Sequence, residues 1–253
     1  MIEIKKLLYA TDLKEPTLSL FEGLLDIKKI GLEEIILLSN SPSEDLGRKL
    51  SEDGVNLRAV EGSGPIPLRI LETASRENPS LVVAHLNREK KKFFRGGTAR
   101  NLIKNTLFPL LLINETGEGR SFSTRGLFDS VILATDWSDS FRKTLFYIIG
   151  LKEILGVLDI IHVLSEKLTV RDIRHLKERV EEIRKICLEE EIDTESHFYA
   201  GKIAGEILLA SKDYNASLIA MGYQSKGILK EIFSGSTCYR VAEASSVPVL
   251  VIP

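Results

Sequence analysis

Short apolar runs alternate along the chain with longer stretches in which apolar residues recur every three or four positions. The first pattern is typical of buried strands and the second of amphipathic helices. In the first half we expect strands at 4–10, 34–38, 55–60, 81–84 and 110–113, with helices at 14–30, 41–53, 66–76 and 98–106. Strands that alternate with helices predict βαβ units and a mostly parallel sheet.

The same pattern then starts again. Residues 115–126 contain few packing residues and are interpreted as a linker. Beyond them, 130–136 repeats the pattern of 6–12, and 247–252 repeats that of 108–113, with three further correspondences in the same order. The chain is therefore interpreted as a tandem duplication of one α/β unit. The domains are expected at 1–114 and 127–253.

The second copy is longer than the first, mainly between its second and third strands, where a long helix takes the place of the short helix expected at 41–53. This helix is expected at 170–191 and is rich in charged residues. One face carries the apolar positions Ile173, Leu176, Val180, Ile183 and Ile186. The simpler interpretation is that this face packs on its own sheet, and the alternative is that it contacts another protein.

Composition narrows the class of protein. With 43% hydrophobic and 28% charged residues, the chain resembles an ordinary soluble globular protein, and its net charge of −2 gives no support for nucleic-acid binding. Cys187 and Cys238 lack metal-ligand spacing and fit a reducing compartment. Since there is neither a signal-peptide pattern nor an apolar run of roughly 18 residues, we expect a cytoplasmic protein without membrane insertion.

The strongest candidate site lies in the last strand–helix unit. The apolar run 218–221 ends at Gly222, and a loop leads to Gly235-Ser236-Thr237, where a helix is expected to begin. Glycine allows a backbone to approach a ligand closely, and a helix start offers unpaired N–H groups with a partial positive charge. The pattern therefore predicts an anion site between the end of this strand and the start of the helix.

These residues resemble the universal stress protein family in its two-domain form, and the resemblance covers nearly the whole chain. The family has a Thr-Asp or similar pair after its first strand, here Thr135-Asp136. After its fourth strand it has Gly-x-x-Gly, nine residues and Gly-Ser or Gly-Thr. Gly222 and Gly235-Ser236 stand at the matching distances, while Ser225 replaces the second glycine. The fifth strand of the family resembles Pro-Val-Leu-Val, as at 248–251.

The resemblance implies an α/β fold with two tandem open parallel five-stranded sheets, helices on both faces, and pairing through the fifth strands. This architecture is similar to that of the adenine nucleotide alpha hydrolases. Joining two copies in one chain would make the pairing of these apolar edge strands intramolecular. Whether two such chains form a homodimer is left open.

The resemblance also implies that the second copy binds ATP or AMP, with or without Mg²⁺. Asp136 would accept from the adenine amino group, and Val163 would meet the base through its backbone. The other contacts expected around the nucleotide are Ala134, Thr135, Met221, Gly222, Ser225, Lys226, Gly235, Ser236 and Thr237. The alternatives are a helix cap or Asx turn for Asp136, a solvated side chain for Lys226, and an ordinary helix start for Gly235-Ser236.

The first copy is a poorer candidate for the same site. His85 occupies the position of Gly222, and the loop before Gly97 is one residue shorter. We interpret His85 as a loop histidine whose side chain would obstruct the ligand. The basic stretch 88–95 is interpreted as a solvated loop, with an interface around Phe93 and Phe94 as the alternative. No nucleotide is expected here.

The resemblance implies a regulatory nucleotide-binding module of the stress response, and the motifs that are missing from the sequence argue against an enzyme. It contains no phosphate loop of the Gly-x-x-x-x-Gly-Lys-Ser/Thr type and no Gly-x-Ser-x-Gly elbow, and its four histidines show no metal-ligand spacing. Two alternatives remain open. One is a scaffold or signalling partner that binds no nucleotide, and the other is a slow ATP hydrolase.

Overall fold

The structure is a computed structural model that describes residues 2–11, 23–38, 44–87, 97–115, 126–164, 169–223 and 235–253. Each copy contributes five strands to one sheet. In the first copy the elements are β1 (Lys6–Thr11), η1 (Leu25–Ile30), β2 (Glu34–Leu38), α2 (Glu44–Glu52), β3 (Asn56–Val60), α3 (Ile66–Glu77), β4 (Leu81–Asn87), α5 (Thr98–Asn105) and β5 (Leu110–Glu115).

The second copy repeats this order. Its elements are β6 (Ser130–Thr135), α6 (Asp139–Ile149), η2 (Lys152–Ile154), β7 (Val157–Leu164), α7 (Val170–Glu189), β8 (Thr194–Ala200), α8 (Ile203–Asp213), β9 (Leu218–Gly222), α9 (Gly235–Ala244) and β10 (Val249–Ile252). Among the described residues, no helix combines the length and apolar content needed to cross a bilayer.

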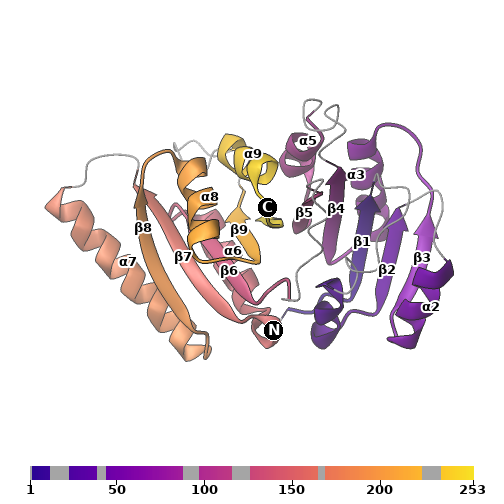
Figure 1. Cartoon of the computed structure of the whole chain (residues 1–253), viewed down its shortest axis with the longest axis horizontal. Coiled ribbons are helices and arrows are strands. Elements are labelled where there is room, and N and C mark those ends of the chain that lie inside the picture. Colours follow the sequence, from indigo (N-terminus) through magenta and orange to yellow (C-terminus); the bar gives the residue numbers. More distant parts are fainter. Residues whose placement is uncertain are drawn as a thin grey trace.

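The ten strands lie in the order β3-β2-β1-β4-β5-β10-β9-β6-β7-β8 (Figure 1). In each copy the chain runs outward over three parallel strands and then returns to the other side of its first strand. The return creates a topological switch point between β1 and β4 and another between β6 and β9. Open α/β sheets bind ligands at the carboxyl ends of strands at such points.

Helices cover both faces of the sheet, each above its own apolar core. Residues of η1, α2, α6 and α7 join one core, and residues of α3, α5, α8 and α9 join the other. Apart from the edge strands β3 and β8, the strands between them are largely buried on both sides, which explains why they form continuous apolar runs rather than alternating patterns. The α/β fold class is confirmed.

The two copies meet where β5 and β10 pair antiparallel. In register, Leu110, Leu111 and Leu112 lie opposite Val251, Leu250 and Val249, and all six are almost fully buried. Above this seam, α5 contacts α9, and the guanidinium of Arg100 lies 5.9 Å from the ring centroid of Tyr239. Asn114 Nδ2 donates to the carbonyls of Ala242 at 2.6 Å and Ser245 at 3.3 Å. The seam therefore joins the copies by backbone, side-chain and helix contacts.

Two strands of the first copy are longer than the apolar runs predicted. The β4–β5 ladder continues through Leu86↔Asn114 and Asn87↔Glu115, because backbone pairing does not require an apolar side chain. His85 therefore lies inside β4 and is only 4% exposed, so its interpretation as a loop histidine is wrong. Glu115, expected as the first linker residue, belongs to β5, and 116–125 lie outside the described residues.

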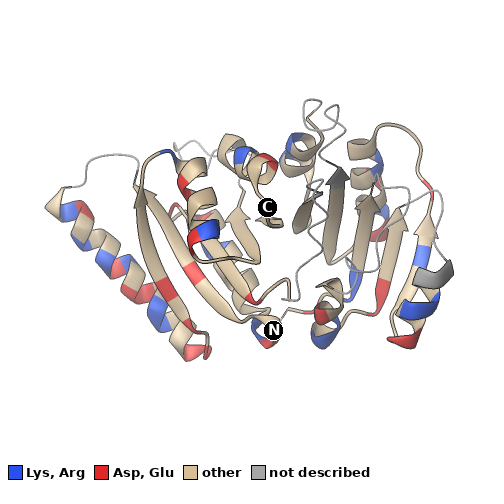
Figure 2. Ribbon diagram, viewed as in Figure 1, with Lys and Arg blue, Asp and Glu red and all other residues tan. Residues whose placement is uncertain are grey.

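Helix α7 packs over only part of its length. A capping box formed by Thr169 and Asp172 begins the helix. Ile183 and Cys187 are buried, whereas Val170 is 77% and Ile173 is 55% exposed. Of the predicted apolar face, Leu176, Val180 and Ile186 are half-buried and Ile183 is buried, so only Ile173 in the first turn departs from packing on the sheet. Lys, Arg, Asp and Glu follow one another along α7, which lies at the outer end of the sheet (Figure 2).

The seam predicts a specific crosslink. Opposed residues in antiparallel strands have Cα atoms roughly 4.5–5.5 Å apart, which suits a disulfide. The double variant Leu112→Cys with Val249→Cys is expected to form a disulfide under mild oxidation, because these positions face each other. On a non-reducing gel the product should be a fast-migrating monomer that reverts with reductant.

The control for this crosslink is Leu112→Cys with Val251→Cys, which is two residues out of register and is expected to stay reduced. A crosslinked species of twice the chain mass would show that the fifth strands pair between chains. Equal crosslinking of both variants would contradict the register.

Candidate functional site

The predicted site residues lie around the switch point of the second copy. Ala134 pairs with Met221, so Thr135 and Gly222 end their strands side by side. Cys238, in the first turn of α9, donates through Sγ to the carbonyl of Gly222 at 3.4 Å. The end of β6, the end of β9 and the start of α9 therefore converge.

The turn from β6 to α6 is shaped by its own side chains. Asp136 Oδ1 accepts from the backbone N–H of Ser138 at 3.0 Å, and Thr135 Oγ1 accepts from that of Trp137 at 2.9 Å. Ser138 in turn caps α6 by accepting from the N–H of Phe141. The Asx turn weighed as an alternative for Asp136 is thus present. It uses one oxygen of a carboxylate that has about four acceptor positions.

Asp136 also acts electrostatically on the start of α9. Burial raises the pKa of the Cys238 thiol to about 12, and the negative charge of Asp136 contributes to the increase. Asp136 directly follows Thr135, at the end of β6 and next to the end of β9, to which Cys238 of α9 is bonded. A thiol with this pKa is protonated at neutral pH and is not a nucleophile.

Gly222 has a packing role that the sequence did not reveal. A Cβ atom at this position would lie 2.5 Å from the carbonyl oxygen of Ser140 and 2.9 Å from Thr144 Oγ1. Both atoms belong to the first turns of α6, so glycine allows this helix to pack against the end of β9. The sequence predicted that a ligand would approach this backbone closely. The structure shows that helix α6 does so.

The remaining predicted residues divide into three groups. The side chains of Ala134, Met221 and Val163 belong to the apolar core, so their backbone is what a ligand could contact. Val163 is the first residue of β7 beyond the last β6–β7 pair, Thr135↔His162. Helix α9 begins at Gly235 as predicted, with Ser236 exposed and Thr237 8% exposed. Ser225 and Lys226 lie outside the described residues.

Two aromatic residues lie beside the site, and no sequence pattern predicted their place there. His162 is 7% exposed, and its Nδ1 lies 2.9 Å from the carbonyl oxygen of Thr135. Burial lowers the pKa of His162, which favours a neutral ring that donates to this carbonyl. Trp137 packs 5.2 Å from it, centroid to centroid, with a left-handed φ of 62°. A positive φ is rare for a bulky residue, so local contacts must hold this turn.

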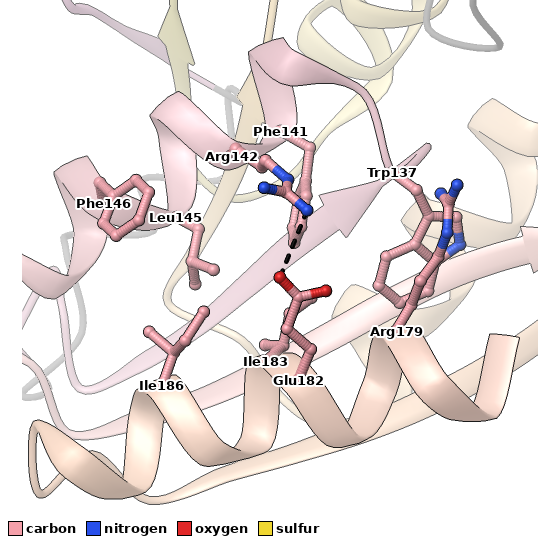
Figure 3. A pocket seen from close by; sticks show the side chains of 9 residues that line it. All are labelled: Trp137, Phe141, Arg142, Leu145, Phe146, Arg179, Glu182, Ile183 and Ile186. Carbon is pink, nitrogen blue, oxygen red and sulfur yellow. Dashed lines mark hydrogen bonds and ion pairs between the residues drawn. The ribbon is translucent and has the colours of Figure 1, made fainter. Parts of the chain in front are cut away.

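A cavity of about 130 Å³ lies on the side of Trp137 that faces α6 and α7 (Figure 3). The guanidinium of Arg179 lies 5.9 Å from the indole centroid, and Arg142 pairs with Glu182 at 3.3 Å across the opening. The other lining residues are apolar: Phe141, Leu145, Phe146, Ile183 and Ile186. None of the predicted nucleotide contacts lines this cavity. Its volume is also below the roughly 300 Å³ at which ligand pockets begin.

The equivalent point in the first copy is built differently. His85 pairs with Thr11 in the register that places Gly222 next to Thr135. Its ring Nδ1 lies 3.1 Å from the hydroxyl of Tyr9, a residue with no exposed surface. The imidazole is thus held in the core beside Tyr9, in the position where glycine admits α6 in the second copy.

Comparison with known proteins gives one family. Residues 129–253 match the model of the Universal stress protein family. Universal stress protein YxiE of Bacillus subtilis (strain 168) is 27% identical over 147 residues, which cover 50% of this chain and 99% of YxiE. The match to the family model thus covers the second copy.

The solved structures extend the similarity to the whole fold. A universal stress protein from Archaeoglobus fulgidus DSM 4304 has a TM-score of 0.70 and 24% identity, with 99% of this chain and 96% of that chain covered. A functionally unknown protein from Pseudomonas aeruginosa PAO1 has a TM-score of 0.69 and 15% identity, with 98% and 92% covered. Both copies therefore have known structural counterparts in one chain.

The packing of Gly222 predicts a loss of stability. Gly222→Ala is expected to lower the free energy of unfolding by about 1–3 kcal/mol, because its Cβ would collide with backbone atoms of α6. Gly205→Ala in α8 is the matched control, since the nearest atom to its Cβ lies 4.0 Å away. Alanine should instead stabilise that helix by about 0.5–1 kcal/mol. Urea denaturation followed by circular dichroism measures both, and equal stabilities would contradict the close packing of α6 on β9.

Proposed function

This chain belongs to the universal stress protein family, and on that premise we propose that its second copy binds an adenine nucleotide, ATP or AMP, as a regulatory module. The observation that carries the proposal is the convergence of Asp136, Gly222 and the start of α9 at the switch point between β6 and β9. The binding domain is 127–253, and 1–114 serves as its structural partner.

The roles follow from the chemistry of each group. The first N–H groups of α9, at Gly235, Ser236 and Thr237, would receive the phosphate oxygens, because a helix start carries a partial positive charge. Asp136 can accept from the exocyclic amino group of adenine, and the backbone of Val163 can hydrogen-bond the base. Met221 and Ala134 support the floor of the site from the core. Ser225 and Lys226 enter the proposal by sequence alone, and ATP would bring Mg²⁺ with its phosphates.

We propose binding without rapid turnover. The described groups nearest the site are committed to structure: Cys238 is protonated, and His162 hydrogen-bonds the carbonyl of Thr135. A nucleotide that is bound without being hydrolysed would act as a signal rather than as a substrate. We also place the protein in the cytoplasm, since both cysteines are free and buried, as is usual in a reducing compartment.

The test uses the duplication as its control. Isothermal titration with ATP and with AMP is expected to show one site per chain. Asp136→Ala should weaken binding by roughly 10- to 100-fold, as expected for loss of a hydrogen bond to a charged group. Asp12→Ala changes the corresponding residue of the first copy and should leave the affinity unchanged. Trp137 is the only tryptophan and adjoins Asp136, so its emission should change on binding.

Three results would contradict parts of this proposal. The absence of both heat and a fluorescence change with either nucleotide would favour the scaffold that binds no ligand. Equal weakening by Asp12→Ala would move the site to the first copy. Steady phosphate release that disappears in Gly235→Val would favour the slow hydrolase.

Gly235→Val separates the phosphate contacts from the contacts with the base. A β-branched side chain at the start of α9 would occupy space that phosphates need. ATP affinity should therefore fall at least about tenfold more than adenosine affinity, measured by the same titration, with an unchanged far-ultraviolet circular dichroism spectrum. An equal loss for both ligands would show that the phosphates do not lie at α9.

A further inference from the structure

A histidine and two carboxylates meet near the amino-terminal ends of β7 and β8, far along these strands from the nucleotide site. Asp159 lies on β7, and Glu195 and His197 lie on β8. His197 Nε2 is 3.0 Å from Asp159 Oδ1 and 3.8 Å from Glu195 Oε2. One ligand atom from each residue can be chosen so that all three lie within 4.8 Å of one another. Asp159 is far from the other two residues in the sequence, and the register between β7 and β8 brings them together. No sequence motif therefore indicates the cluster.

The cluster combines a buried interior with an exposed rim. The side chain of Asp159 is 8% exposed and that of His197 is 17% exposed, whereas that of Glu195 is 75% exposed. A buried carboxylate is costly unless it is paired or binds a cation. Glu195 is free to rotate toward or away from the other two, because most of its side chain lies in solvent. An ion could therefore enter from this side, with water completing its coordination.

Tyr214 fixes the orientation of the imidazole. Its hydroxyl lies 2.9 Å from His197 Nδ1, and the two rings stack with centroids 4.2 Å apart. When the hydroxyl accepts from Nδ1–H, the lone pair of Nε2 points toward the carboxylates. Histidines that bind metals are usually held in this way, with the second ring nitrogen hydrogen-bonded to a supporting group.

We propose that Asp159, Glu195 and His197 bind one divalent transition-metal ion of the Zn²⁺ type. Ligands placed about 2.0–2.2 Å from Zn²⁺ in a tetrahedron are roughly 3.3 Å apart. The separation of 3.0 Å between His197 and Asp159 is close to this value, and Glu195 at 3.8 Å needs a small rotation. Two carboxylates balance the charge of the ion, and the imidazole favours Zn²⁺ over Mg²⁺ or Ca²⁺, which prefer oxygen ligands.

The ion would connect the outermost strand to the rest of the sheet. Among the described strands, β8 is the edge strand of the second copy, and β7 is its one neighbour in the strand order. An ion shared by β7 and β8 would stabilise this edge, and Tyr214 would couple it to the end of α8. The site does not depend on nucleotide binding, since its residues lie apart from Asp136 and α9.

The experiment uses the full chain, stripped with EDTA, dialysed and titrated with ZnCl₂ by calorimetry, with metal content measured by mass spectrometry. The wild type is expected to bind one Zn²⁺ per chain in the micromolar range or tighter. Tyr214→Phe should weaken binding by about 10- to 100-fold, as expected for a supporting residue, and Asp159→Asn by more. Asparagine keeps the shape and one acceptor oxygen of the aspartate while removing its charge.

His175→Asn is the matched control. His175 is exposed on α7, and its Nδ1 lies 3.4 Å from a carboxylate oxygen of Glu178. Among the described residues, this pair is not part of a group of three possible metal ligands. Its replacement should leave Zn²⁺ affinity unchanged. With Co²⁺ in place of Zn²⁺, visible absorption bands should appear in the wild type and in His175→Asn and be lost in Asp159→Asn.

Asp159→Asn disturbs a buried pair, so Glu195→Gln provides a second test at an exposed position. It should weaken Zn²⁺ binding about tenfold while the circular dichroism spectrum and the nucleotide affinity stay unchanged. The proposal is overturned if the wild type binds no Zn²⁺ in the micromolar range. It is also overturned if Glu195→Gln and Tyr214→Phe both bind as tightly as the wild type. Either outcome would leave His197 as a structural residue that is hydrogen-bonded to Asp159 and Tyr214.

Discussion

The antiparallel pairing of β5 with β10 is the contact on which the rest of the molecule depends. Each strand ends its own parallel sheet, and each is apolar on both faces, so either one alone would leave a row of unpaired backbone groups beside exposed leucine and valine. Pairing them turns two open sheets into one continuous sheet of ten strands. The cost of bringing the edges together is reduced because both belong to one chain.

The seam also explains how the first copy can support the second without repeating its site. Helix α9 is held from one side by the bond of Cys238 to Gly222, and from the other by Asn114 of β5, which donates to the carbonyl of Ala242. The end of the candidate anion-binding helix is therefore held partly by the first copy. At the matching switch point of that copy, His85 fills the place of Gly222 and bonds to Tyr9. The two copies share their topology, but the change from glycine to histidine alters what can pack at the end of the fourth strand.

The hydrophobic pattern of the sequence predicted most of the strands and helices, and the elements that differ do so for physical reasons. Strand β4 was expected to end at Ala84, but pairing with β5 extends it to Asn87. Backbone hydrogen bonds between strands do not require apolar side chains, so the hydrophobic pattern did not show where β4 ends. Helix α7 was expected to pack along its apolar face, and only Ile173 in its first turn departs from this. At the candidate site, Asp136 and Gly222 were predicted from the sequence, and the structure places them at the ends of neighbouring strands. The contact between α6 and Gly222 could not be predicted from the sequence.

By itself, the sequence determined the alternation of strands and helices, the duplication and the family, because these depend on local burial and on spacing along the chain. Only the tertiary structure decided that His85 is a core residue and that Trp137 adopts a left-handed turn against His162. It also decided that Asp159 meets His197, 38 residues later in the chain. Contacts of this kind are set by the register between neighbouring strands, which joins residues that no short-range pattern connects.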